Sequence, residues 1–159
     1  MDDSVVAGKI RRWGFAYHSA QDYEWAGGIG GNIIQFEGNI QTLDSCSGIL
    51  NDDRQKIVTR PFAGGFTDES KLKSLLQDFK LTTTVNELGA TLADVSLCLA
   101  HTISSKYGTV ICSMFTPKHI EDNVHALSRF RNDPKMIEVV STIIQNRLHL
   151  ASKTEFHIQ

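Results

Sequence analysis

The hydrophobic and polar positions of the chain form short apolar runs separated by longer amphipathic stretches. Apolar runs of strand length, bounded by turn residues, indicate strands, and apolar residues at helical spacing indicate amphipathic helices. The pattern predicts strands near residues 11–17, 32–38, 56–60 and 109–113. It predicts helices near residues 20–27, 69–79, 91–105, 117–130 and 134–149. This alternation favours βα units and a parallel sheet, so we expect an α/β fold in a single domain, residues 1–159.

Length and charge narrow the classes of protein that this pattern allows. The 159 residues are 41% hydrophobic and 21% charged, which suits a globular chain with its own core. The net charge is −2 and the basic residues are scattered, so a nucleic-acid backbone is not attracted. No apolar run approaches the roughly 20 residues of a membrane span, and the acidic N-terminus is unlike a signal peptide. We therefore expect a cytoplasmic protein that binds neither nucleic acid nor membrane.

The positions of cysteine and histidine give no metal-type spacing. Cys98 and Cys112 lie in apolar runs, where we expect small buried hydrophobic residues, and Cys46 makes the count odd. The histidines in helical patterns, His125 among them, have no second histidine one turn away. We expect no metal site.

One strand-to-helix turn combines an apolar run with a polar helix start. Residues 110–124 (VICSMFTPKHIEDNV) pass through Ser113 to Thr116 and Pro117. Thr116 suits an N-cap and Pro117 a first helical residue, because proline lacks the N–H that would have no partner there. A helix that begins after a strand points free N–H groups and a positive dipole end outward, where a phosphate can bind. The structural alternative is a capped helix that binds nothing.

Five stretches, this turn included, resemble the second half of the aldo-keto reductase family, in the family's order. Residues 8–18 (GKIRRWGFAYH), 32–39 (NIIQFEGN) and 56–65 (KIVTRPFAGG) resemble its fifth, sixth and seventh strands. Residues 91–100 (TLADVSLCLA) resemble the helix before the eighth strand, and residues 110–124 that strand and its following helix. Nothing in the chain resembles the first four strands or the catalytic Asp, Tyr, Lys and His. The resemblance implies half of a (β/α)8, TIM-like barrel: four βα units with an extra C-terminal helix.

The implied half-barrel would have unpaired strand edges. Its concave face would also expose side chains that normally fill a closed interior. A two-fold dimer that completes eight strands removes both problems. We therefore expect a homodimer, and a separate N-terminal half-barrel partner is the alternative.

The loops after strands build the ligand site of such barrels. Residues 39–53 hold Ser, Gly, Asn and Asp with few apolar anchors, and residues 64–68 follow the third predicted strand. We expect both segments on the ligand-binding side of the fold. The glycines at 27–31 precede a strand instead of following one, so they are not a dinucleotide-binding motif.

The resemblance also implies a nicotinamide nucleotide, NADP or NAD, at the barrel mouth. The family's counterpart of Gln35 contacts the nicotinamide carboxamide, and Asn39 matches the Asn that ends the same strand. At the adenosine end, the matching positions are Ser113, Thr116, His119 and Asn123. The family often has Lys and Arg at positions 113 and 119, where they pair with the 2′-phosphate of NADP. Their replacement by Ser and His leaves NAD, or another phosphorylated small molecule, as the alternative ligand.

Strand alternation aims Gln35, Glu37 and Asn39 toward the barrel interior and the apolar residues between them toward the helices. A polar row on an inner face suits a ligand site, and a polar ladder at a dimer seam is the structural alternative. Because an unpaired carboxylate is costly to bury, we expect either that a cation meets Glu37 or that its pKa rises, and Arg60, on the neighbouring strand, is the candidate cation. Such a pair can be structural, or it can orient the carboxylate or phosphate of a substrate.

Tyr17 and His18 end the first predicted strand, where the family usually has a Ser-Asn pair against nicotinamide. Both side chains can transfer protons, and histidine titrates near neutral pH. With Glu37 and Arg60 they are the candidate catalytic residues. A packed aromatic ring and a solvated imidazole are the structural alternatives for the first two.

Three classes of function follow. The first is a reductase-related protein that binds a nicotinamide nucleotide or another phosphorylated small molecule, and transfers hydride only with a partner or not at all. The second is a dimeric half-barrel enzyme of different chemistry, such as proton transfer, isomerisation or cyclisation. The third is a non-catalytic interaction subunit.

Overall fold

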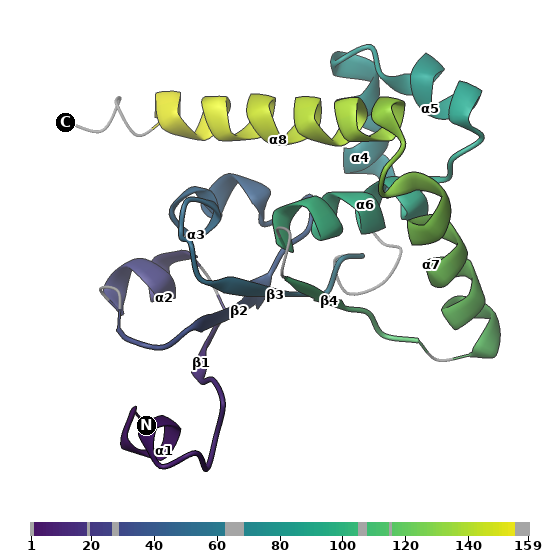
Figure 1. Ribbon diagram of the computed structural model, residues 1–159. Coiled ribbons are helices and arrows are strands. Elements are labelled where there is room, and N and C mark those ends of the chain that lie inside the picture. The colour runs from purple at the N-terminus through teal and green to yellow at the C-terminus, as the bar shows by residue number, and fades with distance from the viewer. Residues whose placement is uncertain are drawn as a thin grey trace.

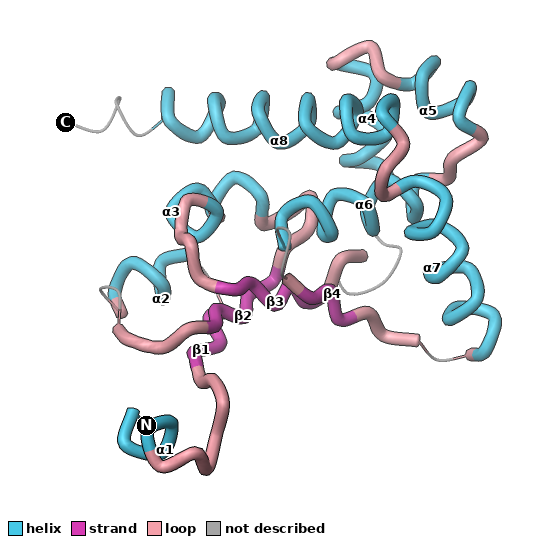
Figure 2. Tube along the Cα trace, in the orientation of Figure 1, coloured by secondary structure: helices cyan, strands magenta, loops and turns pink. Residues whose placement is uncertain are grey.

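The computed structural model describes residues 2–18, 20–26, 29–62, 69–104, 108–114 and 116–154. Its strands are β1 (Gly14–Tyr17), β2 (Ile33–Glu37), β3 (Gln55–Thr59) and β4 (Thr109–Ile111). They form one sheet in the order β1-β2-β3-β4, and every neighbouring pair is parallel (Figure 1). Figure 2 shows the four strands side by side. Spatial order follows chain order, as in consecutive βα units.

Helices connect the strands and continue after the last one. Between the N-terminus and β4 lie α1 (Asp2–Val6), α2 (Ala20–Trp25), the 3₁₀ turn η1 (Leu43–Ser45), α3 (Ser47–Leu50), α4 (Glu69–Asp78), α5 (Thr82–Leu88) and α6 (Leu92–Ser104). After β4 come α7 (Pro117–Phe130) and α8 (Pro134–Thr154). The predicted α/β class, strands and five helices are confirmed, with ends that differ by at most five residues.

Three short helices were not predicted. α1 and α3 are each about one turn long, too short for a recognisable apolar period. α5 begins with three threonines, which have low helix propensity, and Gly89 closes it in the left-handed conformation at φ +61°. Tertiary packing outweighs local preference in α5, since Val85 is buried in the core.

The main helices lie on one face of the sheet in two layers. α6 packs on β3 and β4, and α8 crosses α6 on the side away from the sheet (Figure 1). Ile34, Phe36 and Val58 point from the strands into this core and are at most 2% exposed. The predicted orientation of the apolar residues of the second strand is therefore confirmed.

The cysteines take part in the same packing. Cys98 in α6 is 3% exposed, and burial raises its pKa to about 12, as suits a small hydrophobic residue. Cys46 is equally buried, and burial raises its pKa to about 11. Cys112 is only half-buried, so the prediction for this residue holds in part.

Residues 39–53 differ from the expected polar loop. Four of their side chains are at most 4% exposed and belong to the core: Ile40, Leu43, Cys46 and Ile49. The segment is the crossover from β2 to β3, and it packs against α2 and α8. The prediction of few apolar anchors was wrong, because an apolar residue every third position is enough to bury one side of a short helical segment. The other expected loop, residues 64–68, lies outside the described residues.

The second face of the sheet has no helical cover within the described ranges. The strand register places Ala16, Gln35, Ile57 and Thr109 in one row, and all four are half-buried or exposed. We call this surface the open face; it consists of Gly14, Ala16, Ile33, Gln35, Glu37, Gln55, Ile57, Thr59, Thr109 and Ile111. All-parallel sheets are usually covered on both faces, so an uncovered face is an unusual feature of this sheet.

Asp52, Arg54 and Tyr23 form a hydrogen-bonded cluster at the amino end of β3. The Asp52 carboxylate accepts hydrogen bonds from the Arg54 guanidinium at 2.8 Å and from the Tyr23 hydroxyl at 2.8 Å. Arg54 also donates to the carbonyl of Ile29 at 2.9 Å. The hydrogen bonds from Arg54 hold the pKa of Asp52 far below its usual range. This cluster is structural and lies at the end of the strands opposite to the cavity described next.

Candidate functional site

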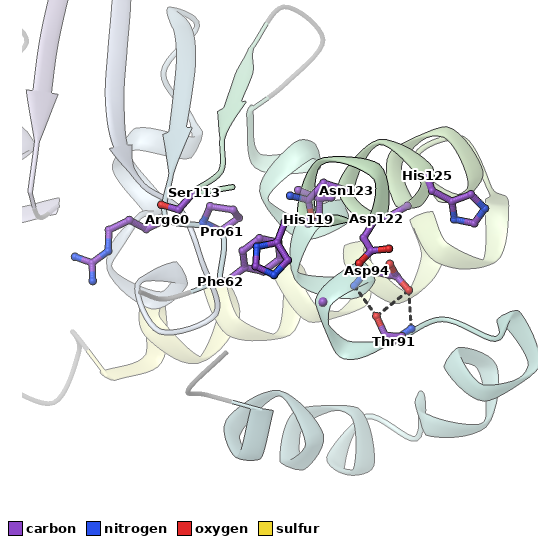
Figure 3. Close-up of a pocket in the computed structure, with 13 residues that line it drawn as sticks. Arg60, Pro61, Phe62, Thr91, Asp94, Ser113, His119, Asp122, Asn123 and His125 are labelled. Carbon is purple, nitrogen blue, oxygen red and sulfur yellow. Dashed lines mark hydrogen bonds between the residues drawn. The ribbon is translucent and has the colours of Figure 1, made fainter. Parts of the chain in front are cut away.

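A cavity of about 500 Å³ opens at the carboxyl ends of β3 and β4, between these strands and the first turns of α6 and α7. Its polar lining residues are Arg60, Thr91, Asp94, Ser113, His119, Asp122, Asn123 and His125 (Figure 3). Pro61, Phe62 and Leu97 add apolar surface. Ligands of parallel α/β sheets bind at this end of the strands, and the volume lies within the range of small-molecule sites.

The first turn of α7 forms as the sequence predicts. The Thr116 side chain accepts a hydrogen bond from the backbone N–H of His119 at 3.3 Å, and Pro117 is the first helical residue. Helical spacing then turns His119 and Asn123 toward the cavity. The cap fixes the direction of α7 relative to β4, and with it the position of these two side chains.

Thr91 and Asp94 cap the N-terminus of α6 through reciprocal hydrogen bonds. The backbone N–H and the hydroxyl of Thr91 donate to the Asp94 carboxylate at 2.7 and 2.9 Å, and the Asp94 N–H donates to the Thr91 hydroxyl at 3.2 Å. Figure 3 shows both side chains at the rim of the cavity. The cap holds the negative charge of Asp94 at the cavity wall.

The end of β3 adopts an unusual backbone conformation at the cavity mouth. Arg60 has φ +53°, in the left-handed region that non-glycine residues seldom occupy. The Asn39 side-chain amide donates to the Arg60 carbonyl at 3.1 Å, and the Arg60 guanidinium donates to Glu37 at 2.8 Å. Strained residues held by such contacts cluster at functional sites. The contacts favour a functional role for this turn.

Three of the predicted nucleotide-binding residues line the cavity: Ser113, His119 and Asn123. Thr116 acts beside them as the cap of α7. Gln35 lies elsewhere, half-buried on the open face.

Asn39 is 2% exposed, and both polar atoms of its amide are engaged by the backbone, so it holds the turn after β2. The geometry therefore weighs against the predicted contact between Asn39 and a ligand. The predicted roles of all these residues remain predictions.

The four candidate catalytic residues are not brought together. Glu37 and Arg60 form the expected ion pair. Tyr17 points to the helix-covered side, is 7% exposed, and packs edge-on against Tyr23 with ring centroids 5.5 Å apart. His18 is exposed beyond the end of β1. Within one chain, the packed-aromatic alternative describes Tyr17 better than a proton-transfer role.

Carboxylates outnumber fixed positive charges at the cavity. Two carboxylates, Asp94 and Asp122, line the cavity, and Arg60 is the one Lys or Arg among the described lining residues. Figure 3 shows the Arg60 guanidinium extending away from both carboxylates. The cavity therefore offers acceptors for hydroxyl and amino groups more readily than charge for a phosphate dianion.

Sequence reasoning missed the contribution of α6. The helix itself was predicted near residues 91–105, and Thr91 and Asp94 have the Ser/Thr-x-x-acid spacing of a helix cap at its start. No local pattern, however, brings that start to α7, because the two segments are separated by β4. His125 was considered only as a metal ligand, and it lies at the cavity edge.

Within the described residues, no group of three His, Cys, Asp or Glu side chains could hold a metal ion. Of the helices in the described ranges, none combines the length and the apolar character needed to cross a bilayer.

The sequence was also compared with known proteins. No family model matches the chain, and no curated protein matches it.

Proposed function

We propose that the cavity between α6, α7 and the ends of β3 and β4 binds the adenosine end of a nicotinamide nucleotide. The observation that carries the proposal is that Ser113, His119 and Asn123, chosen from sequence as nucleotide-binding positions, line one cavity at the carboxyl ends of parallel strands. The adenine ring would lie on the apolar surface of Pro61 and Phe62. The ribose hydroxyls would donate to the nearby carboxylates and Asn123.

The charges favour NAD over NADP as the ligand. A 2′-phosphate has a charge of about −1.5 to −2 near neutral pH. It would approach Asp94 and Asp122, while the charge of Arg60 is already balanced by Glu37. The free 2′-hydroxyl of NAD carries no charge to be repelled, and it can donate a hydrogen bond to one of these carboxylates. We therefore propose NAD(H), with weaker binding of NADP(H).

The scaffold that we propose for this site is half of an aldo-keto reductase-like (β/α)8 barrel. Four parallel strands in chain order, helices on one face and an uncovered second face support it. Because no residues of the chain resemble the family's Asp, Tyr, Lys and His, we propose binding of the nucleotide without hydride transfer by this chain alone. Four further strands would complete the barrel.

Fluorescence titration with NADH and NADPH tests the proposal. NADH should bind more tightly than NADPH. Asn123→Ala should lower the affinity for NADH about fivefold, because the loss of one hydrogen bond costs about 1 kcal/mol. Ser128→Ala is the matched control, since Ser128 is exposed on the same helix outside the cavity and its loss should change nothing. Absence of NADH binding below millimolar concentration would refute the proposal.

A further inference from the structure

The sheet leaves two strand edges unpaired among the described residues. β1 and β4 are its outer strands, and each pairs with one neighbour only. The open face lies between these two edges. Unpaired parallel edges beside an uncovered face point to a surface that is covered in the assembled protein.

The exposed apolar side chains show where that surface lies. Among the described residues, nine large hydrophobic side chains are exposed. Four belong to β1 or to segments near it in the chain: Val6 in α1, Phe15 in β1, Trp25 in α2, and Ile29. Four belong to β4 or follow it: Ile111 in β4, Met114, and Ile120 and Val124 in α7. Single exposed apolar residues are common, but eight of these nine belong to the two outer strands or to segments near them in the chain.

The open face joins these two edges. Its central row mixes Ile57 with Gln35 and Thr109, and Glu37 lies at its carboxyl end. Closed parallel barrels fill their interior with such inward-facing side chains, with polar groups toward the mouth. The open face and both edges therefore form one continuous surface.

We propose that a second copy of this chain covers this surface, with β4 of each copy paired in parallel with β1 of the other to close an eight-stranded barrel. All strands of one copy point the same way, so a two-fold axis along the strand direction lets both seams form at once. Each seam brings the apolar β1 surroundings of one copy against the apolar β4 and α7 surroundings of the other. The inference rests on the half-barrel part of the proposed function.

The seam also completes the cavity. The carboxyl end of β1 in one copy lies beside the carboxyl end of β4 in the other, because the pairing is parallel. His18, which follows β1, then lies near Ser113, which lines the cavity. In the dimer each nucleotide site would thus receive an imidazole from the second copy, although the candidate catalytic residues do not converge within one chain.

Light scattering coupled to size exclusion tests the assembly on the full chain at about 50 μM. The expected mass is twice 17.7 kDa. Ile111→Lys should convert the protein to a monomer, since Ile111 is 49% exposed at the β4 edge and the charge would be buried only in the dimer. The matched control is Ile137→Lys on α8, 46% exposed and away from both edges, which should remain a dimer.

Circular dichroism of Ile111→Lys shows whether the variant folds, and Thr109→Arg, an exposed position on the same strand, is the second variant if it does not. A wild-type monomer, or folded edge variants that stay dimeric, would overturn the proposal. NADH titration separates the two ideas. A wild-type monomer that binds NADH would support the nucleotide-binding cavity and refute the dimer. A dimer that binds no NADH would support the dimer and refute the nucleotide-binding cavity.

Discussion

The Arg60 guanidinium donates a hydrogen bond to the Glu37 carboxylate at 2.8 Å, across the carboxyl ends of β3 and β2. Glu37 belongs to the open face, and Arg60 lines the cavity, so the pair connects the two surfaces. The Arg60 and Glu37 side chains are 56% and 26% exposed, so the pair contributes little to stability, on the order of 0.5 kcal/mol. Its consequence is electrostatic, because Glu37 neutralises the one Lys or Arg among the described cavity residues.

Glu37→Gln should therefore change the choice between the two nucleotides. Without the carboxylate, the charge of Arg60 becomes available to a 2′-phosphate. We expect the affinity for NADPH to rise about fivefold relative to NADH, which corresponds to about 1 kcal/mol. Parallel fluorescence titrations of the variant with both nucleotides give this ratio.

The control for net charge is Glu87→Gln. Glu87 pairs with Lys135 at 3.0 Å on the surface of α5 and α8, away from the cavity. This variant should leave the ratio unchanged. An equal rise in both variants would show that the total charge, and not the Glu37–Arg60 pair, sets the preference.

His119→Arg should strengthen binding of a 2′-phosphorylated nucleotide at neutral pH. Arginine supplies a permanent charge and two parallel donors at the cavity wall, and we expect about a fivefold gain for NADPH.

Ser128→Arg places the same charge farther along α7 at an exposed position outside the cavity. Ser128→Arg should raise the affinity for NADPH by less than half as much as His119→Arg does. If His119→Arg leaves NADPH binding unchanged, the turn before α7 is a capped helix without a role in ligand binding.

The turn around Thr116 shows what the sequence can predict. N-cap and first-turn preferences are local, so Thr116, Pro117 and the start of α7 follow from neighbouring residues alone. The same holds for the strands and main helices, whose apolar periods are strong. The Glu37–Arg60 pair was also predictable, because two parallel neighbouring strands end at the same edge.

Asn39 shows where sequence reasoning fails. The predicted strand ended near residue 38, and alternation placed Asn39 in the same polar row as Gln35 and Glu37, but the strand ends at Glu37 and the chain turns. Asparagine side chains commonly bond the backbone of a turn, and here the amide bonds Arg60 and Gln41. Whether a polar side chain serves a turn or a ligand depends on tertiary contacts. For the same reason, local sequence patterns cannot predict that α6 and α7 line the same cavity.

Asp52→Asn should destabilise the fold in a pH-dependent way. The Asp52 and Arg54 side chains are 13% and 17% exposed, and their pairing should contribute about 2 kcal/mol at pH 6. Because the folded-state pKa of Asp52 is lowered, this stability is present above the unfolded value near 3.9 and is lost as the pH falls toward the folded-state pKa. Urea unfolding should show a difference between wild type and variant that shrinks below about pH 4.

Asp122→Asn provides the comparison for that measurement. Asp122 pairs with Lys118 at 3.0 Å, and both side chains are more than half exposed. Its loss should change the free energy of unfolding by less than about 0.5 kcal/mol at pH 6. If Asp122→Asn lowered the free energy of unfolding as much as Asp52→Asn does, the Asp52–Arg54 cluster would stabilise the fold no more than an exposed ion pair.

The position of the bound nucleotide tests the central claim most directly. In a two-dimensional NMR titration of the labelled chain with NADH, the backbone amide signals of Thr91, Ser113, His119 and Asn123 should shift first and saturate together, because all four residues line one cavity. The signals of the Asp52–Arg54 cluster, at the opposite end of β3, should stay in place. Shifts confined to residues outside the cavity, or none at millimolar NADH, would contradict the account.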